Sequence, residues 1–440
     1  MFKSSMFNTV ELVDNTLMVY NSLNGHVARI DNPNSIKEVF CAGGFITDIT
    51  ETRMNRLYKD GFIVKDTSEE FLKGRKRFYE RVFDSTLSLV ILSTEQCNFR
   101  CKYCYESFSR GAITDECKDA IIRFVKNNIS QHNAISVSWF GGEPLLAQDA
   151  IEEISSSLIQ ICHNSGKPYS SAITTNGYLL TPSVLDRLRK CRVTSFQVTL
   201  DGPKEIHDRG RILVNGKGTF DVIMDNLRSI RDECRSSTFK IDIRINVTYR
   251  LLDYLEEFIL FLYHEFSCDP RFSFYFRPVG DWGGDRVKEI SDNMVHSLSS
   301  FYSIIENSPV ALNTDAYIQL LNSPLCMAAM RNHYVIGSDA TVYKCTMLFD
   351  NPLNTIGKLL KTGIMEINED LFNRWVMRGF ECDECNKCFY SPLCSGGTCP
   401  AVGIAITGEK CGYEKNAIGH VLRLIYNDSL NSATCKVTRY

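Results

Sequence analysis

The chain has 440 residues, of which 44% are hydrophobic and 23% are charged, and its formal net charge is −3. This length predicts two or three domains of ordinary globular composition. The small net charge gives no reason to expect a nucleic-acid or anionic-membrane partner. The first residues lack the basic and apolar segments of a signal peptide, and the most apolar helical stretch, 255–266, is short and contains three glutamates, so we expect no membrane span.

Residues 1–80 predict a small domain of strands and helices. Alternating apolar residues and turn residues predict strands over 8–15, 16–22, 25–31 and 62–66, and helices over 35–43 and 50–61. This order of elements is typical of a winged helix. The charged segment 68–83 predicts a helix that connects this domain to the next one.

Residues 81–310 predict a second domain in which strands and helices alternate regularly. The expected strands are 85–94, 134–140, 170–175, 194–200, 239–248 and 271–279. The helices between them are expected to begin near Thr114, Gln148, Thr181, Thr219 and Leu252, and Pro182 makes Thr181 a good N-cap. Six such units predict an α/β fold with a parallel sheet and outer helices, a partial (β/α)6 barrel rather than a closed eight-stranded one.

Four unusual segments directly follow the first four strands of this predicted barrel. They are CNFRCKYC at 97–104, GGEP at 141–144, TNG at 175–177 and DGP at 201–203. The carboxyl ends of parallel barrel strands meet at one rim, which is where such folds place their chemistry. We therefore expect these four segments to form one site.

Residues 311–440 predict a third domain that is loop-rich and held by metal, because cysteines are dense there and strand–helix regularity stops. Of the 18 cysteines, three lie in 97–104 and five in 382–399, with Cys326, Cys345 and Cys411 around the second group. A long chain without an export signal indicates reduced thiols in the cytoplasm. The scattered cysteines are expected to be small packed hydrophobic residues, and they are Cys41, Cys117, Cys162, Cys191, Cys234, Cys268 and Cys435.

Cys97, Cys101 and Cys104 offer three thiolates within eight residues, and no histidine lies among them. A structural zinc site usually has four protein ligands. Three soft thiolates instead suit a [4Fe–4S] cluster in which one iron is left open to bind a small molecule.

The segment CNFRCKYC resembles the signature of the radical S-adenosylmethionine (SAM) family. The resemblance implies that the open iron binds the amino and carboxylate groups of SAM. Reductive cleavage, driven by a low-potential donor such as ferredoxin or flavodoxin, would then give methionine and a 5′-deoxyadenosyl radical. It also implies that Cys97, Cys101 and Cys104 are the catalytic and metal-binding cysteines.

The same resemblance assigns SAM contacts to the other rim segments. Tyr103 matches the position near the adenine, and Arg211, with Arg244 as the second candidate, matches the arginine that meets the SAM carboxylate, although either arginine could be a solvated surface residue. The remaining expected contacts are to the amine from Gly141, Gly142 and Glu143, and to the ribose from Thr174, Thr175 and Asn176.

The second cysteine group resembles the SPASM extension of radical SAM peptide-modifying enzymes, which holds two auxiliary [4Fe–4S] clusters. Two features depart from that pattern: four residues separate Cys394 from Cys399 where three are usual, and Ala340 replaces a glycine five residues before Cys345. A treble-clef-like zinc site is the alternative. The implied ligands are Cys385, Cys388, Cys394 and Cys411 for one cluster, and Cys326, Cys345 and Cys399 for the other, with Cys382 or an open position fourth.

The N-terminal segment resembles small domains that bind the leader of a precursor peptide by adding it as a strand to a sheet edge. Together the resemblances imply a radical SAM/SPASM oxidoreductase that modifies a ribosomally made precursor peptide (RiPP maturation). The expected product is a cross-link such as a Cys thioether.

Two other functions are weighed against this one. An anaerobic sulfatase-maturing enzyme would share both cysteine domains, but it carries an aspartate, its presumed base, where this chain has Thr346. A winged-helix iron–sulfur regulator that binds DNA would not need the GGEP, TNG and DGP segments, and the helix at 50–61 lacks the basic surface that recognition requires.

Overall fold

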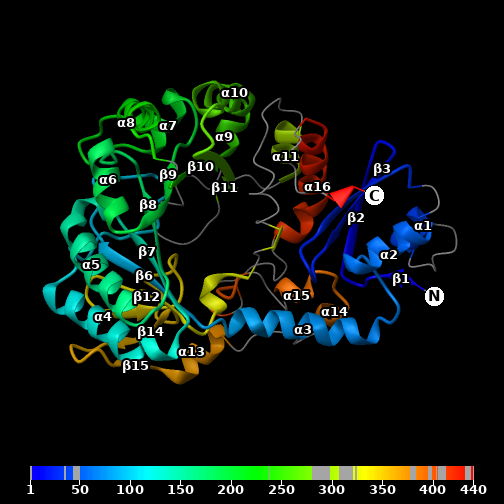
Figure 1. Ribbon diagram of the computed structural model, residues 1–440. Coiled ribbons are helices and arrows are strands. Elements are labelled where there is room, and N and C mark those ends of the chain that lie inside the picture. Colours follow the sequence, from blue (N-terminus) through cyan, green and yellow to red (C-terminus); the bar gives the residue numbers. More distant parts are fainter. Residues whose placement is uncertain are drawn as a thin grey trace. The chain divides into compact units, whose positions relative to one another are not determined.

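The computed structural model divides the chain into two compact units (Figure 1). Unit 1 comprises Met1–Asp84, Ser297–Arg331 and Trp375–Tyr440, and unit 2 comprises Ser85–His296 and Asn332–Arg374. Over the described ranges, no helix combines the length and hydropathy that crossing a bilayer requires. The structure describes residues 2–33, 36–42, 50–236, 238–279, 298–306, 321–322, 325–376, 383–394, 399–402, 404, 413–431 and 438–439.

Unit 2 is built on a parallel sheet whose strands lie side by side in chain order. Its six consecutive strands are β6 (Thr86–Thr94), β7 (Ala134–Gly141), β8 (Tyr169–Thr175), β9 (Val193–Thr199), β10 (Lys240–Val247) and β11 (Phe272–Pro278). Each pairs in parallel with the next, with Leu87 opposite Ile135 and Ile243 opposite Val198, for example. The predicted strands and the parallel α/β sheet are therefore confirmed.

Helices connect these strands and cover the outside of the sheet (Figure 1). Thr181 caps α6 as predicted, and Thr114, near which a helix is expected to begin, caps α4: each hydroxyl accepts the backbone N–H three residues later. The helix expected near Leu252 starts later, at Leu255, since a short separate helix precedes it. The helices are α4 (Asp115–Asn128), α5 (Gln148–Asn164), α6 (Pro182–Lys190), α7 (Lys204–Gly210), α8 (Phe220–Glu233), α9 (Tyr249–Leu252) and α10 (Leu255–Phe266), with 3-10 turns η1 (Ile129–Gln131) and η2 (Pro144–Ala147).

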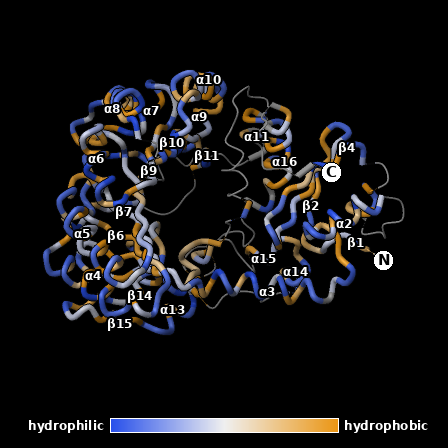
Figure 2. The backbone as a smooth tube through the Cα atoms, in the orientation of Figure 1, coloured by the Kyte–Doolittle hydropathy of each residue, from blue (hydrophilic) through white to orange (hydrophobic). Residues whose placement is uncertain are grey.

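The apolar faces of these helices pack against the sheet. In α4, for example, Ile121 and Val125 are buried, and charged residues occupy the opposite face. Figure 2 shows the resulting mixture of hydrophilic and hydrophobic positions along the outer helices. The core of unit 2 therefore lies between the sheet and its helical layer, and the strand ends are left to form the site.

The sheet continues beyond the six predicted strands. Strand β12 (His333–Ile336) pairs in parallel with β6, and β13 (Thr341–Tyr343), β14 (Thr355–Leu359) and β15 (Met365–Ile367) follow in antiparallel order. The prediction of a loop-rich segment after residue 310 is wrong for this stretch, because strands of three to five residues carry too little alternation to be recognised. Helix α13 (Glu369–Val376) follows β15.

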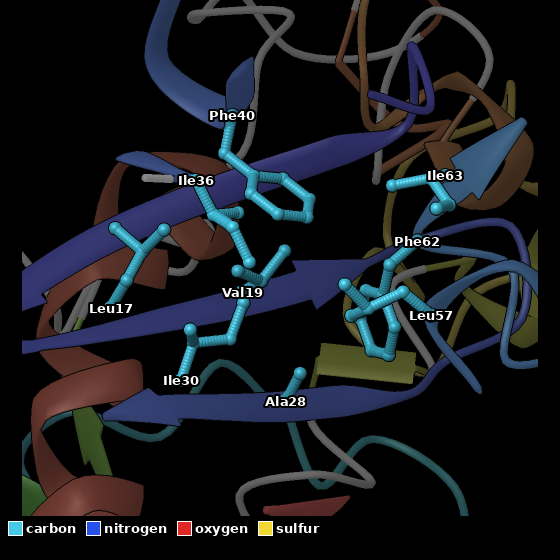
Figure 3. Packing of buried hydrophobic residues seen from close by; sticks show 9 residues of the cluster. All are labelled: Leu17, Val19, Ala28, Ile30, Ile36, Phe40, Leu57, Phe62 and Ile63. Carbon is cyan, nitrogen blue, oxygen red and sulfur yellow. The ribbon is translucent and has the colours of Figure 1, made fainter. Parts of the chain in front are cut away.

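Unit 1 contains the elements predicted for the first 80 residues. An antiparallel sheet is formed by β2 (Asn8–Val13), β3 (Thr16–Asn21) and β4 (Val27–Asp31), and β1 (Lys3–Ser4) pairs with β5 (Ile63–Val64). The helices are α1 (Lys37–Ala42), α2 (Glu51–Lys59) and α3 (Ser68–Val82). Side chains from β3, β4, α1, α2, β5 and adjoining residues form one apolar cluster, which Figure 3 shows: Leu17, Val19, Ala28, Ile30, Ile36, Phe40, Leu57, Phe62 and Ile63.

Segments far along the chain complete unit 1. Strand β16 (Thr438–Arg439) pairs in parallel with β4, and helix α16 (Tyr413–Asn431) packs on β2 and β3 and on α11 (Leu298–Glu306). Arg423 of α16 pairs with Glu11 of β2 and with Glu306. Short helices α14 (Asp383–Asn386) and α15 (Ser391–Cys394) carry part of the second cysteine group, and α15 packs on α3.

Candidate active site

One cavity of unit 2, about 180 Å³ in volume, opens at the carboxyl ends of the parallel strands. Residues from three of the four rim segments, 97–104, 141–142 and 174–176, line the cavity together, and Asp201 of the fourth segment accepts a hydrogen bond from Tyr103. The predicted site residues that line it are Cys97, Cys101, Tyr103, Cys104, Gly141, Gly142, Thr174, Thr175, Asn176, Arg211 and Arg244. Glu143 does not line the cavity.

The cysteine loop is held in place by the segment that follows β9. The backbone N–H groups of Arg100 and Lys102 donate to the carbonyls of Ile212 (2.8 Å) and Gly210 (3.0 Å). In the other direction, Val214 N–H donates to Asn98 O at 3.0 Å. The loop is thus fixed by a short ladder of backbone hydrogen bonds, which a motif search in the sequence does not reveal.

The cysteine side chains are suited to a metal cluster rather than to free ionisation. Burial, the largest cause, and neighbouring acidic groups raise the pKa of Cys97 to about 12. The Phe99 N–H points at Cys97 Sγ at 3.3 Å, where it would stabilise a thiolate. A bound metal deprotonates a coordinating thiol outright, so metal binding would reverse the effect of burial.

Among the described residues, no three His, Cys, Asp or Glu side chains gather as they would around a single metal ion. A [4Fe–4S] cluster binds each cysteine through a different iron, so its ligands line a space rather than converge on a point. Lining one cavity is the arrangement that Cys97, Cys101 and Cys104 have.

The two glycines at the end of β7 are required by close backbone approach. Gly141 has φ +120°, and a Cβ there would lie 2.0 Å from the carbonyl oxygen of Thr94. A Cβ on Gly142 would lie 2.4 Å from the carbonyl oxygen of Gln96. Any other residue would push the β7 loop away from the start of the cysteine loop.

Glu143 is fully buried beneath the cavity and holds the next loop. Its carboxylate accepts hydrogen bonds from Thr175 Oγ1 (2.7 Å), from Asn176 N (2.7 Å) and from Leu145 N (3.0 Å). Burial raises the pKa of Glu143, and these hydrogen bonds oppose that rise. Asn176 in turn donates from Nδ2 to Asn98 Oδ1 at 2.7 Å, which joins the loop after β8 to the cysteine loop.

A second buried network surrounds Tyr103. Its hydroxyl donates to Asp201 and accepts from Arg211 Nη1 (2.6 Å) and from Asn246 Nδ2 (3.2 Å). Asp201 also accepts from the backbone and side chain of Asn246 and forms an ion pair with Arg211 at 3.8 Å. The DGP aspartate therefore positions Tyr103 and Arg211, and Asn246 is a site residue that the sequence analysis missed.

Arg211 has the character of an anion-binding residue. Its side chain is buried, it lies over the ring of Phe99, and its Nε has no hydrogen-bond partner among the described residues. His207, held neutral because burial lowers its pKa well below the usual value, bonds through Nε2 to Thr219, whose hydroxyl donates to the Arg211 carbonyl. A buried guanidinium with an unsatisfied N–H in a cavity wall fits the carboxylate expected there.

Several cavity residues were not predicted. Tyr105, Glu106 and Phe108 directly follow the cysteine motif, so their position could have indicated them, whereas Met347 lies far along the chain and gave no signal. Burial, with Glu95 and Asp350 nearby, raises the pKa of Glu106 to about 8, so this carboxyl is mostly neutral near pH 7. Together these residues give the cavity an apolar, aromatic side next to its charged one.

The second cysteine group is described only in part. Cys326, Cys385, Cys388, Cys394 and Cys399 belong to unit 1 and Cys345 to unit 2, whereas Cys382 and Cys411 lie outside the described residues. Tyr390 N–H points at Cys388 Sγ at 3.4 Å, as Met347 N–H does at Cys345 Sγ. The ligand assignment stays a prediction.

Most of the scattered cysteines that the structure describes are packed in the core, as predicted. Cys117, Cys162, Cys191 and Cys234 are each less than 10% exposed. Cys268 is exposed, so the prediction is wrong for that residue. Cys435 lies outside the described residues, and nothing is described of the Cys41 side chain.

Comparison with known proteins identifies one domain of the chain. Residues 91–259, which include the cysteine loop, match the radical SAM superfamily. The chain carries a radical SAM domain. The family resemblance seen in the sequence is thereby confirmed.

Relatives of the chain include a mycofactocin maturase, a cyclopropyl synthase and sulfatase-maturating enzymes. The mycofactocin maturase MftC of Mycolicibacterium smegmatis is 24% identical over 72% of this chain and 79% of its own length. A cysteine-type anaerobic sulfatase-maturating enzyme of Clostridium novyi is also 24% identical, over 71% and 87%. The radical SAM cyclopropyl synthase TigE of Paramaledivibacter caminithermalis is 24% identical, but the chain spans only about half of it (49%).

A solved structure, anSMEcpe with bound AdoMet, shares the fold. It superposes with a TM-score of 0.57 over 79% of this chain and 99% of its own, at 20% identity. This likeness confirms the α/β radical SAM fold with its central parallel sheet.

Proposed function

We propose that the cavity binds a [4Fe–4S] cluster through Cys97, Cys101 and Cys104 and binds SAM against Gly141, Gly142 and Arg211. The observation that carries this proposal is the meeting of these residues in one cavity of a radical SAM domain. When bound, the cluster and SAM supply a 5′-deoxyadenosyl radical that abstracts a hydrogen atom from the substrate.

The chain's own residues would prepare this site. The Phe99 N–H stabilises the Cys97 thiolate, and the two glycines allow the β7 loop to approach the cysteine loop. Glu143 fixes the loop that carries Asn176, the expected ribose contact. Arg211, oriented by Asp201 and Tyr103, binds the SAM carboxylate, and the neighbouring aromatic side chains exclude water.

We propose further that the substrate is a ribosomally made precursor peptide and that the product is a cross-link such as a Cys thioether. The sulfatase-maturating relative supports a polypeptide substrate, because a sulfatase is itself a protein and the alignment covers most of both chains. The chain would act in the cytoplasm, with an electron donor such as ferredoxin or flavodoxin. The N-terminal sheet of unit 1 would bind the leader, and the second cysteine group would hold two auxiliary [4Fe–4S] clusters in a SPASM domain.

Formation of formylglycine in a sulfatase is the second candidate, favoured by the Clostridium relative. That oxidation needs a proton acceptor near the substrate side chain, and a threonine hydroxyl such as that of Thr346 is a poor one. A thioether-forming enzyme could instead bind the substrate thiol to an iron of an auxiliary cluster, which would lower the pKa of that thiol. Nothing supports the DNA-binding alternative.

The test uses anaerobically reconstituted enzyme with two peptides. One is the product of a short cysteine-containing reading frame beside the gene, and the other is a sulfatase-derived Cys peptide. We expect the first to lose two hydrogens and to resist thiol alkylation, and the second to give no aldehyde. Thr346→Ala should keep much of the activity, whereas Cys345→Ala should abolish it. Efficient aldehyde formation on the sulfatase peptide would decide for the second candidate.

A further inference from the structure

Two arginines line the same cavity, but they differ in how they are held. Arg211 is buried, with Nη1 bonded to the Tyr103 hydroxyl and an ion pair to Asp201. Arg244, on β10, is half-buried, and its Nε donates to Asn246 Oδ1 at 2.9 Å. Among the residues that the structure describes, Arg244 is therefore held through one atom only.

The terminal nitrogens of Arg244 are available to a ligand. Within the part of the chain that the structure describes, neither nitrogen has a hydrogen bond, and no carboxylate lies within ion-pair distance of them. A guanidinium presents its donors in a rigid fork that matches a carboxylate, and the bond from Nε to Asn246 fixes the plane of that fork. Because Arg244 lines the cavity, its side chain can contact a molecule bound there.

The two arginines also differ in the charged groups nearest to them. The charges that act on Arg211 are those of Tyr103, Cys101 and Asp201, so it lies on the side of the cysteine loop. Arg244 acts on Tyr105, whose other charged neighbours are Glu106, Cys104 and Cys345. Glu106 does not neutralise Arg244, because the charges that act on that carboxyl are Glu95, Arg110 and Asp350.

We propose that Arg244 binds a carboxylate of the peptide substrate, either an acidic side chain or the C-terminal carboxylate, beside the residue that is modified. The inference rests on the proposed function, in which Arg211 takes the carboxylate of SAM. It narrows the substrate class to peptides that place a negative charge next to the reacting residue. An amide at that position would leave the cationic fork desolvated and unpaired.

The experiment measures binding of three small probes to SAM-loaded, anaerobically reconstituted enzyme by equilibrium dialysis. The probes are Nα-acetyl-aspartate amide, which has a side-chain carboxylate, Nα-acetyl-alanine, which has a C-terminal carboxylate, and Nα-acetyl-asparagine amide, which has neither. We expect one carboxylate probe to bind about tenfold to a hundredfold more tightly than the asparagine probe. The tighter of the two identifies the source of the carboxylate.

The preference should disappear in Arg244→Gln and be reduced in Arg244→Lys, which keeps the charge but loses the fork. Arg250→Gln, at an exposed arginine of α9, is the matched control and should bind like the wild type. Arg244→Gln should keep its affinity for SAM. Equal binding of all three probes to the wild type would overturn the inference without any variant, and so would loss of SAM affinity in Arg244→Gln.

Failure of the proposed function gives a different result. In that case the wild-type protein would bind neither SAM nor iron, whatever the probes do. A protein that binds SAM but does not discriminate among the probes would retain the proposed function and lose only the assignment of Arg244.

Discussion

Glu143 Oε2 accepts the backbone N–H of Asn176 at 2.7 Å, so a side chain from the loop after β7 holds the backbone of the loop after β8. The other oxygen accepts the hydroxyl of Thr175 and the N–H of Leu145. The GGE motif therefore contributes its glycines to the cavity surface and its glutamate to the support beneath it. The sequence resemblance had placed all three at the SAM amine.

Glu143→Gln should lower both the stability of the protein and its affinity for SAM, although the side chain keeps nearly the same volume. The carboxamide would turn an NH₂ donor toward one of the donors that now face the carboxylate, which leaves buried groups unpaired. We expect a loss of about 1–3 kcal/mol in the free energy of unfolding and weaker SAM binding. Urea unfolding of the apo-protein and equilibrium dialysis of SAM measure the two effects. Glu256→Gln, at an exposed position of α10, is the control, and equal behaviour of both variants would contradict the role given to Glu143.

Glu95 and Arg110, which flank the cysteine loop on its two sides in the sequence, contact each other. Arg110 Nε donates to Glu95 Oε2 at 2.6 Å, and its Nη1 donates to the Tyr343 hydroxyl, also at 2.6 Å. Glu95 also accepts the N–H and hydroxyl of Ser338. This clamp joins both ends of the loop to the turn between β12 and β13.

Arg110→Ala should loosen the loop, because the buried carboxylate of Glu95 loses its cationic partner. We expect faster hydrogen exchange of residues 97–110 and lower retention of iron after reconstitution. Arg123→Ala removes an arginine whose ion pair with Asp119 is exposed, and should change neither quantity. Unchanged exchange in Arg110→Ala would show that the backbone ladder to residues 210–214 holds the loop by itself.

Ala340 has φ +68°, a left-handed conformation that glycine adopts without strain. The sequence resemblance had placed a glycine at this position, and the conformation explains why. We expect Ala340→Gly to raise the free energy of unfolding of unit 2 by about 0.5–1 kcal/mol, since relief of the strained φ exceeds the added entropy of the unfolded chain. Ala340→Val should lower it, because a β-branched residue is strained further there. Urea unfolding compares the three proteins, and a less stable glycine variant would refute the explanation.

The parallel sheet could be predicted because its strands are long and its helices have clear start signals such as Thr181-Pro182. The cavity residues could be predicted where they directly follow a strand or a cysteine motif. Asn246 and Met347 could not, because only the folded chain brings them beside Tyr103 and the cysteine loop. Strands β12–β15 were missed because each is only three to five residues long.

The sequence pattern also did not predict which segments make up unit 1. Helix α16 and strand β16 pack on the sheet formed by residues 8–31, from more than 380 positions along the chain. Removing residues 1–80 to test leader binding would therefore expose the apolar face of α16 as well. Point substitutions on the sheet are therefore a better test of leader binding than the deletion, because they leave the packing of α16 intact.

Replacing Cys97, Cys101 and Cys104 together by alanine should remove one cluster, about four irons per chain, and abolish SAM cleavage. If all three proposed clusters form, the wild-type protein should contain about twelve irons. Iron analysis after anaerobic reconstitution measures both. The matched control replaces the buried core cysteines Cys117, Cys162 and Cys191 by alanine, and should leave the iron content unchanged. Stoichiometric zinc with little iron in the wild type would overturn the cofactor assignment.

His333, on β12, should make unit 2 less stable in acid. Burial, helped by the charge of Lys344, lowers its pKa to about 3, whereas an unfolded histidine has a pKa near 6.5. Between these values the unfolded state binds the proton and the folded state does not, so stability is complete above about pH 6.5 and is lost as the pH falls toward 3. The free energy of unfolding should change by about 1.4 kcal/mol per pH unit between these two pKa values.

His333→Asn is the reference for this effect, since an amide does not titrate and can still meet the Ser88 hydroxyl, which lies 3.0 Å from Nδ1 in the wild type. The free energy of opening of β6 and β12, measured by hydrogen exchange in urea, should be compared between the two proteins at several pH values. Subtracting the free energy of opening of the variant from that of the wild type removes the contributions of all carboxylates, because both proteins contain the same carboxylates. The difference should be constant above pH 6.5 and decrease steadily below pH 6. A difference independent of pH would mean that His333 is not held neutral in the folded protein.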